Sequence, residues 1–541
     1  MKQVRSNRSR ARRRVRLALL AAAATASLAW AATAVAAITV DVTAQNGAPV
    51  VGETVTLYDA NGGYADSAST DAAGRAVIPS PNPSFDPPPY TAKVSVSDDC
   101  RTYTDSSREA QASGISDGQT VALRVDAYVL CAQGYTPPGL PDPTGLVDLA
   151  TGRILVPPGG TVDVDVLAPF GAQNAVVTAG TGGPALNAPV SGDQMRLRAP
   201  AGGYEGPLQL SFTFNSQQVS FQVGTMVSRA VGRPVQLPGP IDLEAIVDVS
   251  GSMAGTDPAY IRRDAVGLLV DLARPGDKLG AVGFDDRYRP IFGLTTITGS
   301  PAVANRLKAL ARSRIRNLGG TDYNDGMDKA YEALTATPGV DPNRQKGIIF
   351  LTDGGHNSGV YRNGHLRFAY NASGRPWPVC AIQLGPKSSF QAADVARLKR
   401  IARETGGQYF ATTKADDLAD IYFRCFGLTT GQRAIGATTT FLFRAGQQKQ
   451  LRRRVPAGLP QATFFVTWGN GRYQVVLIDP RGRRHTAALP GTGTVFRRGA
   501  TFAFFRVTKP RAGSWTVQIK NLRLTTPTDR ARASVTAPRR R

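Results

Sequence analysis

Apolar and polar residues alternate with a period of two along the N-terminal part of the chain, from about residue 38 to residue 237. This period places one face of a β-strand against a core and the other face toward water. The alternating segments are short and are separated by turn signals such as Asn46-Gly47, an arrangement that predicts β-sandwiches. We expect one sandwich over residues 37–131 and a second over residues 132–237, which opens with a Pro/Gly-rich linker.

A helical period replaces the alternation over residues 238–427. Apolar residues recur there at spacings of three and four, as in Leu268, Leu269 and Leu272, between continuous apolar runs such as residues 347–351. A continuous apolar run is typical of a parallel strand that helices cover on both faces. We therefore predict a doubly wound, Rossmann-like α/β domain in this part of the chain.

The period of two returns after residue 427 and predicts a third β-sandwich over residues 428–527. Trp515 is expected in its core, because large aromatic side chains usually anchor small β cores. The run Arg452-Arg453-Arg454 is most simply a solvated loop, and the Arg-rich residues 528–541 are expected to form a disordered basic tail. The predicted fold class is multidomain, with the α/β domain flanked by all-β, immunoglobulin-like sandwiches.

Residues 1–36 have the composition of a secretory signal peptide. Eight basic side chains within the first 16 residues precede an uncharged Ala/Leu-rich run, and Ala34-Val35-Ala36 offers a small-residue cleavage site. Because about 20 apolar residues can span a bilayer, an uncleaved membrane anchor is the alternative interpretation. In both cases we expect an exported protein, secreted or held at the cell surface.

The charge balance of the chain points to polyanions as a second class of partner. The formal net charge is +24, and +16 remains when the eight basic residues of the leader are set aside. Such a surplus attracts polyanions. The simpler interpretation is a solvated basic surface, and we expect no nucleic-acid binding.

Four cysteines permit two disulfides in an exported chain. Pairing of neighbours in sequence is simplest and joins Cys100 to Cys131 and Cys380 to Cys425. Buried thiols are the alternative for Cys380 and Cys425.

Three short segments that lie at or just after apolar stretches carry hydroxyl and carboxylate side chains: residues 248–252, 319–322 and 351–354. A parallel sheet presents its loops at one edge, so these segments could meet at one metal ion. The candidate ligands are Asp248, Ser250, Ser252, Thr321 and Asp353. Two carboxylates and three hydroxyls form a hard-oxygen set suited to Mg²⁺, with Mn²⁺ and Ca²⁺ as alternatives.

With these motifs, residues 241–427 resemble a von Willebrand factor type A domain with an intact metal-ion-dependent adhesion site. The family's Asp-x-Ser-x-Ser motif corresponds to residues 248–252, its second-loop threonine to Thr321 and its third-loop aspartate to Asp353. The resemblance implies that an acidic residue of a protein partner completes the metal shell. Hydroxyl ligands suit that role, because they complete the shell without cancelling the charge of the cation.

Neighbouring residues carry weaker signals. Asp322 and Asp325 are better interpreted as carboxylates at a helix N-terminus than as ligands. His356 lies three residues after the third-loop aspartate, where a loop histidine without a paired acid is usually a solvated ring. The stretches 47–58 and 69–75 resemble the small carboxypeptidase-regulatory-like or collagen-binding-B-like modules of surface proteins.

The sequence favours a binding protein over an enzyme. It holds three histidines and has no His-Glu-x-x-His, Gly-x-Ser-x-Gly or phosphate-loop motif, so we expect no catalytic activity. The leading hypothesis is an exported or cell-surface adhesion protein whose α/β domain binds a protein partner through a divalent metal bridging to the partner's carboxylate. The alternative is electrostatic binding of an anionic cell-wall or extracellular polymer through the basic C-terminal module.

Overall fold

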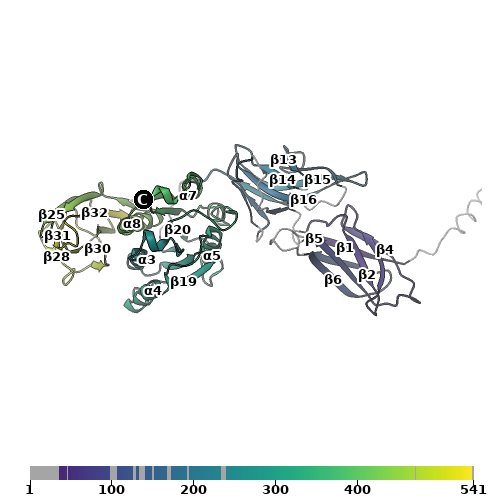
Figure 1. Cartoon of the computed structure of the whole chain (residues 1–541), viewed down its shortest axis with the longest axis horizontal. Coiled ribbons are helices and arrows are strands. Elements are labelled where there is room, and N and C mark those ends of the chain that lie inside the picture. Colours follow the sequence, from purple (N-terminus) through teal and green to yellow (C-terminus); the bar gives the residue numbers. More distant parts are fainter. Residues whose placement is uncertain are drawn as a thin grey trace, which may run out of the picture.

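The chain is elongated, with two β modules at one end, an α/β domain next to them and a third β module at the other end (Figure 1). The computed structural model describes residues 36–44, 47–97, 107–125, 130–132, 140–148, 151–166, 172–191, 194–232, 239–469 and 471–538. The predicted leader up to residue 35, and Cys100 with its predicted bond to Cys131, lie outside these residues. None of the helices within the described ranges combines the length and the hydrophobicity needed to cross a membrane.

The first module consists of two facing sheets, ordered β4-β1-β7 and β3-β2-β5-β6. The strict alternation of β1 buries Ile38, Val40 and Val42 completely between them. The strands are β1 (Ala37–Ala44), β2 (Thr54–Tyr58), β3 (Tyr64–Ser69), β4 (Arg75–Pro79), β5 (Tyr90–Ser97), β6 (Ser107–Ile115) and β7 (Thr120–Val125).

The second module also has two sheets, ordered β12-β15-β16-β10-β9 and β13-β14-β11-β8. Its strands are β8 (Leu130–Ala132), β9 (Leu146–Asp148), β10 (Arg153–Leu155), β11 (Thr161–Val166), β12 (Gln173–Thr178), β13 (Asn187–Ser191), β14 (Gln194–Arg198), β15 (Tyr204–Phe214) and β16 (Gln217–Ser228). Because β8 pairs with β11, residues 130–132 belong to this module, and the predicted boundary at residue 131 lies a few residues too late. The immunoglobulin-like class of the β modules stays a prediction.

The predicted doubly wound α/β domain is present as one sheet ordered β19-β18-β17-β20-β21-β22. All neighbours are parallel except the edge strand β19. The strands are β17 (Ile241–Asp248), β18 (Lys278–Phe284), β19 (Tyr288–Thr296), β20 (Gln345–Thr352), β21 (Val379–Leu384) and β22 (Gln408–Thr412). Every residue of β17 and β20 is buried, as expected for central strands covered on both faces.

Helices cover both faces of this sheet. Helices α3 and α8 share one core with the sheet, and α5 and α7 share the other. The helical segments are α2 (Met253–Thr256), α3 (Ile261–Leu272), α4 (Pro301–Arg314), α5 (Tyr323–Ala336), α6 (Leu366–Ala369), η1 (Lys387–Ser389), α7 (Ala392–Glu404), η2 (Ala415–Asp417) and α8 (Leu418–Thr429). The predicted disulfide between Cys380 of β21 and Cys425 of α8 is confirmed and fastens the last helix to the sheet.

The third module is a sandwich of two sheets, ordered β23-β32-β26-β30-β29, with β24 also paired to β32, and β25-β31-β27-β28. Its strands are β23 (Gln432–Ala434), β24 (Thr439–Phe443), β25 (Gln448–Val455), β26 (Gln461–Trp468), β27 (Arg472–Ile478), β28 (Arg484–His485), β29 (Thr494–Arg498), β30 (Phe502–Thr508), β31 (Gly513–Arg523) and β32 (Asp529–Pro538). Trp515 is buried in its core, as predicted.

Two sequence predictions about this module are wrong. Residues 528–541 are predicted to be a disordered tail, yet residues 529–538 form β32, which pairs with β26 in the middle of a sheet. The strand is stable because Ala531, Ala533 and Val535 alternate into the core, where small side chains fit beside the large aromatics of β26. The run Arg452-Arg453-Arg454 is also no loop, since it lies within β25.

The third module packs against the α8 side of the α/β domain (Figure 1). The rings of Phe423 in α8 and Phe465 in β26 are stacked, with centroids 4.0 Å apart and planes inclined by 7°. Phe465 belongs to the same buried cluster as the leucines of α3. Arg532 of β32 forms an ion pair with Asp417 at the start of α8. The two units therefore share one continuous core.

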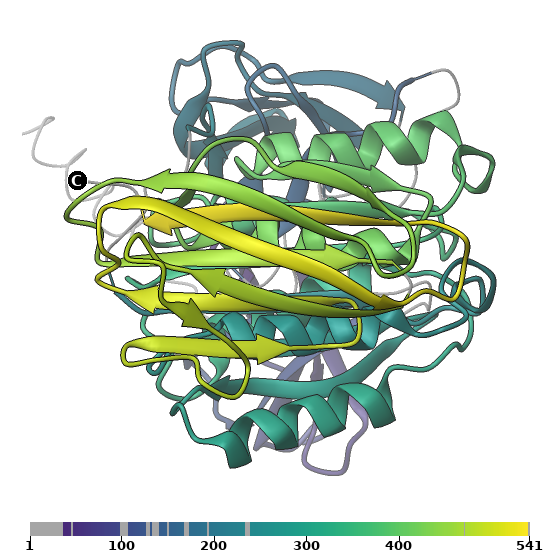
Figure 2. The same cartoon turned by 90° about the vertical axis from the view of Figure 1, so that its left-hand side faces the viewer.

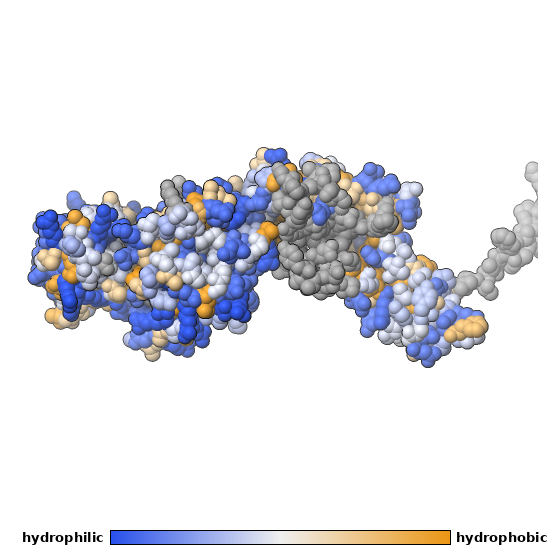
Figure 3. Space-filling view, in the orientation of Figure 1, coloured by the Kyte–Doolittle hydropathy of each residue, from blue (hydrophilic) through white to orange (hydrophobic). Residues whose placement is uncertain are grey.

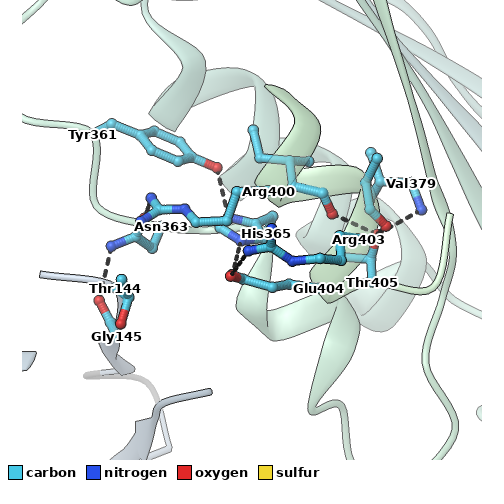
Figure 4. A network of polar contacts seen from close by, with 12 residues as sticks. Thr144, Gly145, Tyr361, Asn363, His365, Val379, Arg400, Arg403, Glu404 and Thr405 are labelled. Atoms are coloured by element: carbon cyan, nitrogen blue, oxygen red, sulfur yellow. Dashed lines mark hydrogen bonds and ion pairs between the residues drawn. The ribbon is translucent and has the colours of Figure 1, made fainter. Parts of the chain in front are cut away.

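The second module holds the other side of the α/β domain through the segment around α6. Asn363 donates from Nδ2 to the carbonyl oxygens of Pro143 at 3.1 Å and Gly145 at 3.0 Å. Figure 4 shows this residue beside a buried polar network, in which His365 lies between Tyr361 and Glu404. The α/β domain is thus fixed to a β module on each side.

Candidate metal centre

The three predicted segments converge at one edge of the sheet of the α/β domain. Strands β17 and β20 are neighbours, and the strand order reverses at β17, which is where open α/β sheets form their binding crevice. Two backbone hydrogen bonds hold the segment before α5 against the loop after β17: Gly251 donates to Gly319 over 3.1 Å, and Leu318 donates to Val249 over 2.6 Å. Residues separated by about 70 positions thereby become neighbours.

Within this cluster the predicted side chains approach one another closely. The hydroxyls of Ser250 and Ser252 are 3.0 Å apart, and Ser252 donates to Asp353 Oδ1 over 2.7 Å. A Cβ atom added at Gly354 would lie 3.8 Å from Thr321 Oγ1 and 4.0 Å from Ser252 Oγ. The hydroxyls of Thr321 and Ser252 therefore flank the same glycine, which leaves room between them.

Asp248 ends β17 and is completely buried. Its Oδ1 accepts the amide of Ser250 at 2.8 Å, and its Oδ2 accepts the hydroxyl of Thr352 at 2.7 Å. Burial and the neighbouring Asp353 carboxylate raise the pKa of Asp248 from its ordinary value of 3.8 to about 6. Burial also raises the pKa of Asp353, against the effect of its hydrogen bonds.

This donor set fits a hard divalent cation. Two carboxylates that are buried side by side disfavour each other's charged form, and a cation between them would remove that penalty. Within the described ranges no three His, Cys, Asp or Glu side chains gather as a metal site, so hydroxyls would have to supply the remaining protein ligands. The centre opens to solvent, because Ser252 and Gly319 are exposed at the rim.

Three further residues support the centre and are missing from the sequence prediction. Thr256, in α2, donates to Asp353 Oδ2, and Thr352 donates to Asp248 as described. Asn357 forms two hydrogen bonds with Thr321, accepting its amide at 2.8 Å through Oδ1 and donating its own amide to the Thr321 carbonyl at 3.0 Å. The only sequence signal for any of them is the position of Thr352 next to Asp353.

The neighbouring residues take structural roles. Asp322 is the N-cap of α5 and accepts the amide of Asn324 at 2.8 Å, as predicted. His356 is not a solvated ring: its side chain is 1% exposed and its Nδ1 accepts the amide of Tyr323 at 3.1 Å. Burial lowers the pKa of His356 from 6.5 to about 4, so the ring is neutral near pH 7.

Comparison with known proteins agrees with this architecture. Residues 245–356 match the family model of the von Willebrand factor type A domain. Calcium-activated chloride channel regulator 3A-1 of Mus musculus is 26% identical over 251 residues, which are 45% of this chain and 26% of that protein. The chain thus spans about a quarter of the length of this relative.

Similar solved structures include a von Willebrand factor type A protein from Catenulispora acidiphila and the pilus adhesin RrgA from Streptococcus pneumoniae. The first is 12% identical with a TM-score of 0.31, and the match covers 62% of this chain and 66% of that one. The second is 11% identical with a TM-score of 0.28 and covers 94% and 83%. The family match over residues 245–356, together with the strand order and the loops at the switch point, shows that this chain contains a von Willebrand factor type A domain.

Proposed function

We propose that this protein is an exported or cell-surface binding protein, whose type A domain (A domain) holds a divalent cation and binds a protein partner through it. The ligands would be Asp248, Ser250, Ser252, Thr321 and Asp353. The observation that carries the proposal is the close approach of the Ser250 and Ser252 hydroxyls to two buried carboxylates at the sheet edge, with the Thr321 hydroxyl beside the same Gly354 as Ser252. Mg²⁺ is the best candidate, because it favours a compact shell of oxygens.

The hydrogen bonds around the two carboxylates support this role. Asp248 already accepts hydrogen bonds at both oxygens, from Ser250 and Thr352, so part of its negative charge is spread over neutral donors. Hydroxyl ligands add no negative charge of their own. A bound cation would therefore remain attractive to a further carboxylate, which a protein partner would supply as Asp or Glu.

The surroundings of the centre suit binding better than catalysis. Ser252 and Gly319 are exposed, and the neighbouring Leu318 is 42% exposed, so a partner would meet an open rim with an apolar residue beside the polar centre. His356 is buried and its Nδ1 already accepts a hydrogen bond, which leaves it poorly placed as a general base. We infer a docking site and no hydrolytic one.

Metal binding is tested by thermal unfolding and calorimetric titration of the chelator-stripped chain with Mg²⁺. We expect Mg²⁺ at 100 times its Kd to stabilise the wild-type chain by about 2.7 kcal/mol. Asp353→Asn should abolish this response and at the same time stabilise the metal-free protein, because it removes one of two buried like charges. The matched control is Asp286→Asn, which removes a 54% exposed carboxylate near the same loop.

The control should keep the full Mg²⁺ response. A wild-type chain that binds no divalent cation, or an Asp353→Asn variant with an undiminished response, would refute the metal centre.

The partner step is tested separately by capture of cell-surface proteins in Mg²⁺. Captured proteins should elute with a chelator, and they should no longer bind once their carboxylates are amidated. Proteins that still bind to the chain after both treatments would contradict a metal-bridged carboxylate.

A further inference from the structure

Positive charge is concentrated in the C-terminal module. Residues 432–541 hold 22 Lys and Arg side chains and two Asp, a net charge of +20 within a total of +24. Residues 37–238, by contrast, hold 10 basic and 18 acidic side chains. The C-terminal module is therefore strongly basic, while residues 37–238, with the two N-terminal β modules, are acidic. A patch of one sign raises the local concentration of ligands of the opposite sign.

One face of the C-terminal module is not covered by the A domain and can present its positive charge to a partner. The sheet containing β26, β30 and β32 packs against the A domain, while the inner side of the β25-β31-β27-β28 sheet packs on the module's own core. The outer side of the latter sheet lies at the far end of the molecule, and Figure 2 looks onto it. Figure 3 shows this end from the side, where many of the residues are hydrophilic, in blue. We call this surface the outer face.

Strand alternation fixes which side chains the outer face carries. Leu451 and Val455 of β25 and Val517 of β31 are buried in the core, so the residues between them point outward. The exposed residues of the outer face are Gln448, Gln450, Arg452, Arg454, Gln474, Arg484, Ser514, Lys520 and Leu522. No carboxylate stands among them. In the described part of the chain none of these four cations forms an ion pair, and Arg484 donates only to Gln518, at 2.9 Å.

The strand register gives the spacing of the charges. Arg452, Thr516, Ile478 and Arg484 lie in one row across four adjacent strands. Three strand spacings put the two arginines of this row about 14 Å apart, and Arg454 lies roughly 7 Å from Arg452 along β25. A flat array with these spacings fits an extended polymer with repeated charges better than a small anion, which would need converging donors.

The chemistry of the outer face selects the class of polymer. Guanidinium groups bind carboxylates through two parallel hydrogen bonds, and the interleaved Gln, Ser and Thr side chains both donate to and accept from hydroxyl groups. The outer face has no exposed aromatic ring on which a nucleic-acid base could stack. Its apolar members are Val476 and Ile478, which are buried or half-buried, and Leu522, which is 48% exposed, so only one exposed apolar side chain could enter a lipid surface.

We infer that the outer face is a binding surface for an acidic polysaccharide, a hydroxyl-rich chain with repeated carboxylates. This site is independent of the metal centre, which lies in a different domain. The bound polymer would relieve the mutual repulsion of Arg452, Arg454 and Arg484, for which the described residues provide no ion-pair partner.

The test measures binding of the intact chain to immobilised polygalacturonate, with neutral dextran as the reference polymer. The triple variant Arg452→Gln/Arg454→Gln/Arg484→Gln should bind roughly 10- to 100-fold more weakly at 0.1 M salt. The matched control, Arg433→Gln/Arg444→Gln/Arg530→Gln, removes three exposed arginines that belong to the other sheet or its turns. It loses the same net charge and should change the affinity less than about threefold. Circular dichroism confirms that both variants are folded.

Several results would overturn the inference. These are no binding of the wild-type chain at low salt, equal binding to dextran, or an equal loss in the two triple variants, which would mean that only net charge matters. Tighter binding to anionic phospholipid vesicles or to single-stranded DNA, lost in the outer-face variant, would assign the surface to a different class of partner. A chelator and Asp353→Asn should leave polygalacturonate binding unchanged, so failure of the metal centre would not affect this result.

Discussion

The contact between the A domain and the third β module can be tested with one substitution, Phe465→Ala. Phe465 is 1% exposed and its ring is stacked on Phe423 of α8. Removal of a buried phenylalanine side chain costs about 3 to 5 kcal/mol, counting the lost transfer free energy and the cavity that remains. Because the ring contacts both the A domain and the third β module, this loss weakens the interaction by which the two units stabilise each other.

The expected temperature shift follows from the size of the coupled unit, residues 239–538. With an unfolding entropy of about 2.1 cal/mol/K per residue, a loss of 3 to 5 kcal/mol lowers the Tm by about 5 to 8 °C if the two units still unfold together. We expect the loss to uncouple them as well, so that one calorimetric transition becomes two. Limited proteolysis should then cut between α8 and β24.

Phe464→Ala is the matched control, because the neighbouring ring is equally buried but faces the core of the sandwich, 5.2 Å from Trp515. This variant should lower the Tm without splitting the transition. If Phe465→Ala costs less than about 1 kcal/mol, or leaves a single transition at an unchanged temperature, the shared core described above does not couple the two units.

Three further outcomes are expected. Thr352→Val keeps the side-chain shape but removes the hydroxyl that donates to the buried Asp248 carboxylate. The free energy of unfolding in urea should fall by about 1.5 to 3 kcal/mol, and calorimetric titration should show a weaker Mg²⁺ affinity. Unchanged values would contradict the hydrogen bond. Replacing Cys380 and Cys425 with Ser should cost about 4 kcal/mol by the loop-entropy estimate for a separation of 45 residues, and a Tm insensitive to both this change and reductant would argue against the bond. Burial lowers the pKa of His365 below 6.5, so the unfolded chain binds more protons than the folded one as the pH falls below about 6.5. The free energy of unfolding should therefore decrease from pH 6.5 downward, and His365→Asn should flatten the profile measured by denaturant titration at a series of pH values.

The central strands of the sheet can be predicted from the sequence, because burial on both faces requires a continuous run of apolar residues. The run at residues 347–351 is uniformly apolar, and it is a strand with helices on both faces. The polar segments that follow β17 and β20 stand at strand ends, so their convergence follows from the parallel arrangement. Asn357 and Thr256 could not be predicted in the same way. Their contacts depend on the path of loops that have no period.

The errors in the third module have a common physical cause. In β32 the buried positions are Ala531, Ala533 and Ala537 around Val535, and alternating alanines between arginines give a weak hydrophobic signal. The strand forms because its neighbour β26 supplies the large side chains. The period of two predicted for this part of the chain implies that one face of β26 is exposed, whereas the A domain covers that face. A sequence does not show which other domain provides such a cover.

Attachment of a β module on each side of the A domain has a mechanical consequence. Besides the backbone that leads into β17, a pull between the two ends of the chain would act on the A domain through two contacts, near Asn363 on one side and at α8 on the other. The first of these points is six residues from Asn357, which is bonded to Thr321 at the metal centre. Tension along the molecule would therefore be transmitted to the loops that would hold the cation. The disulfide between Cys380 and Cys425 would keep α8 from separating from the sheet.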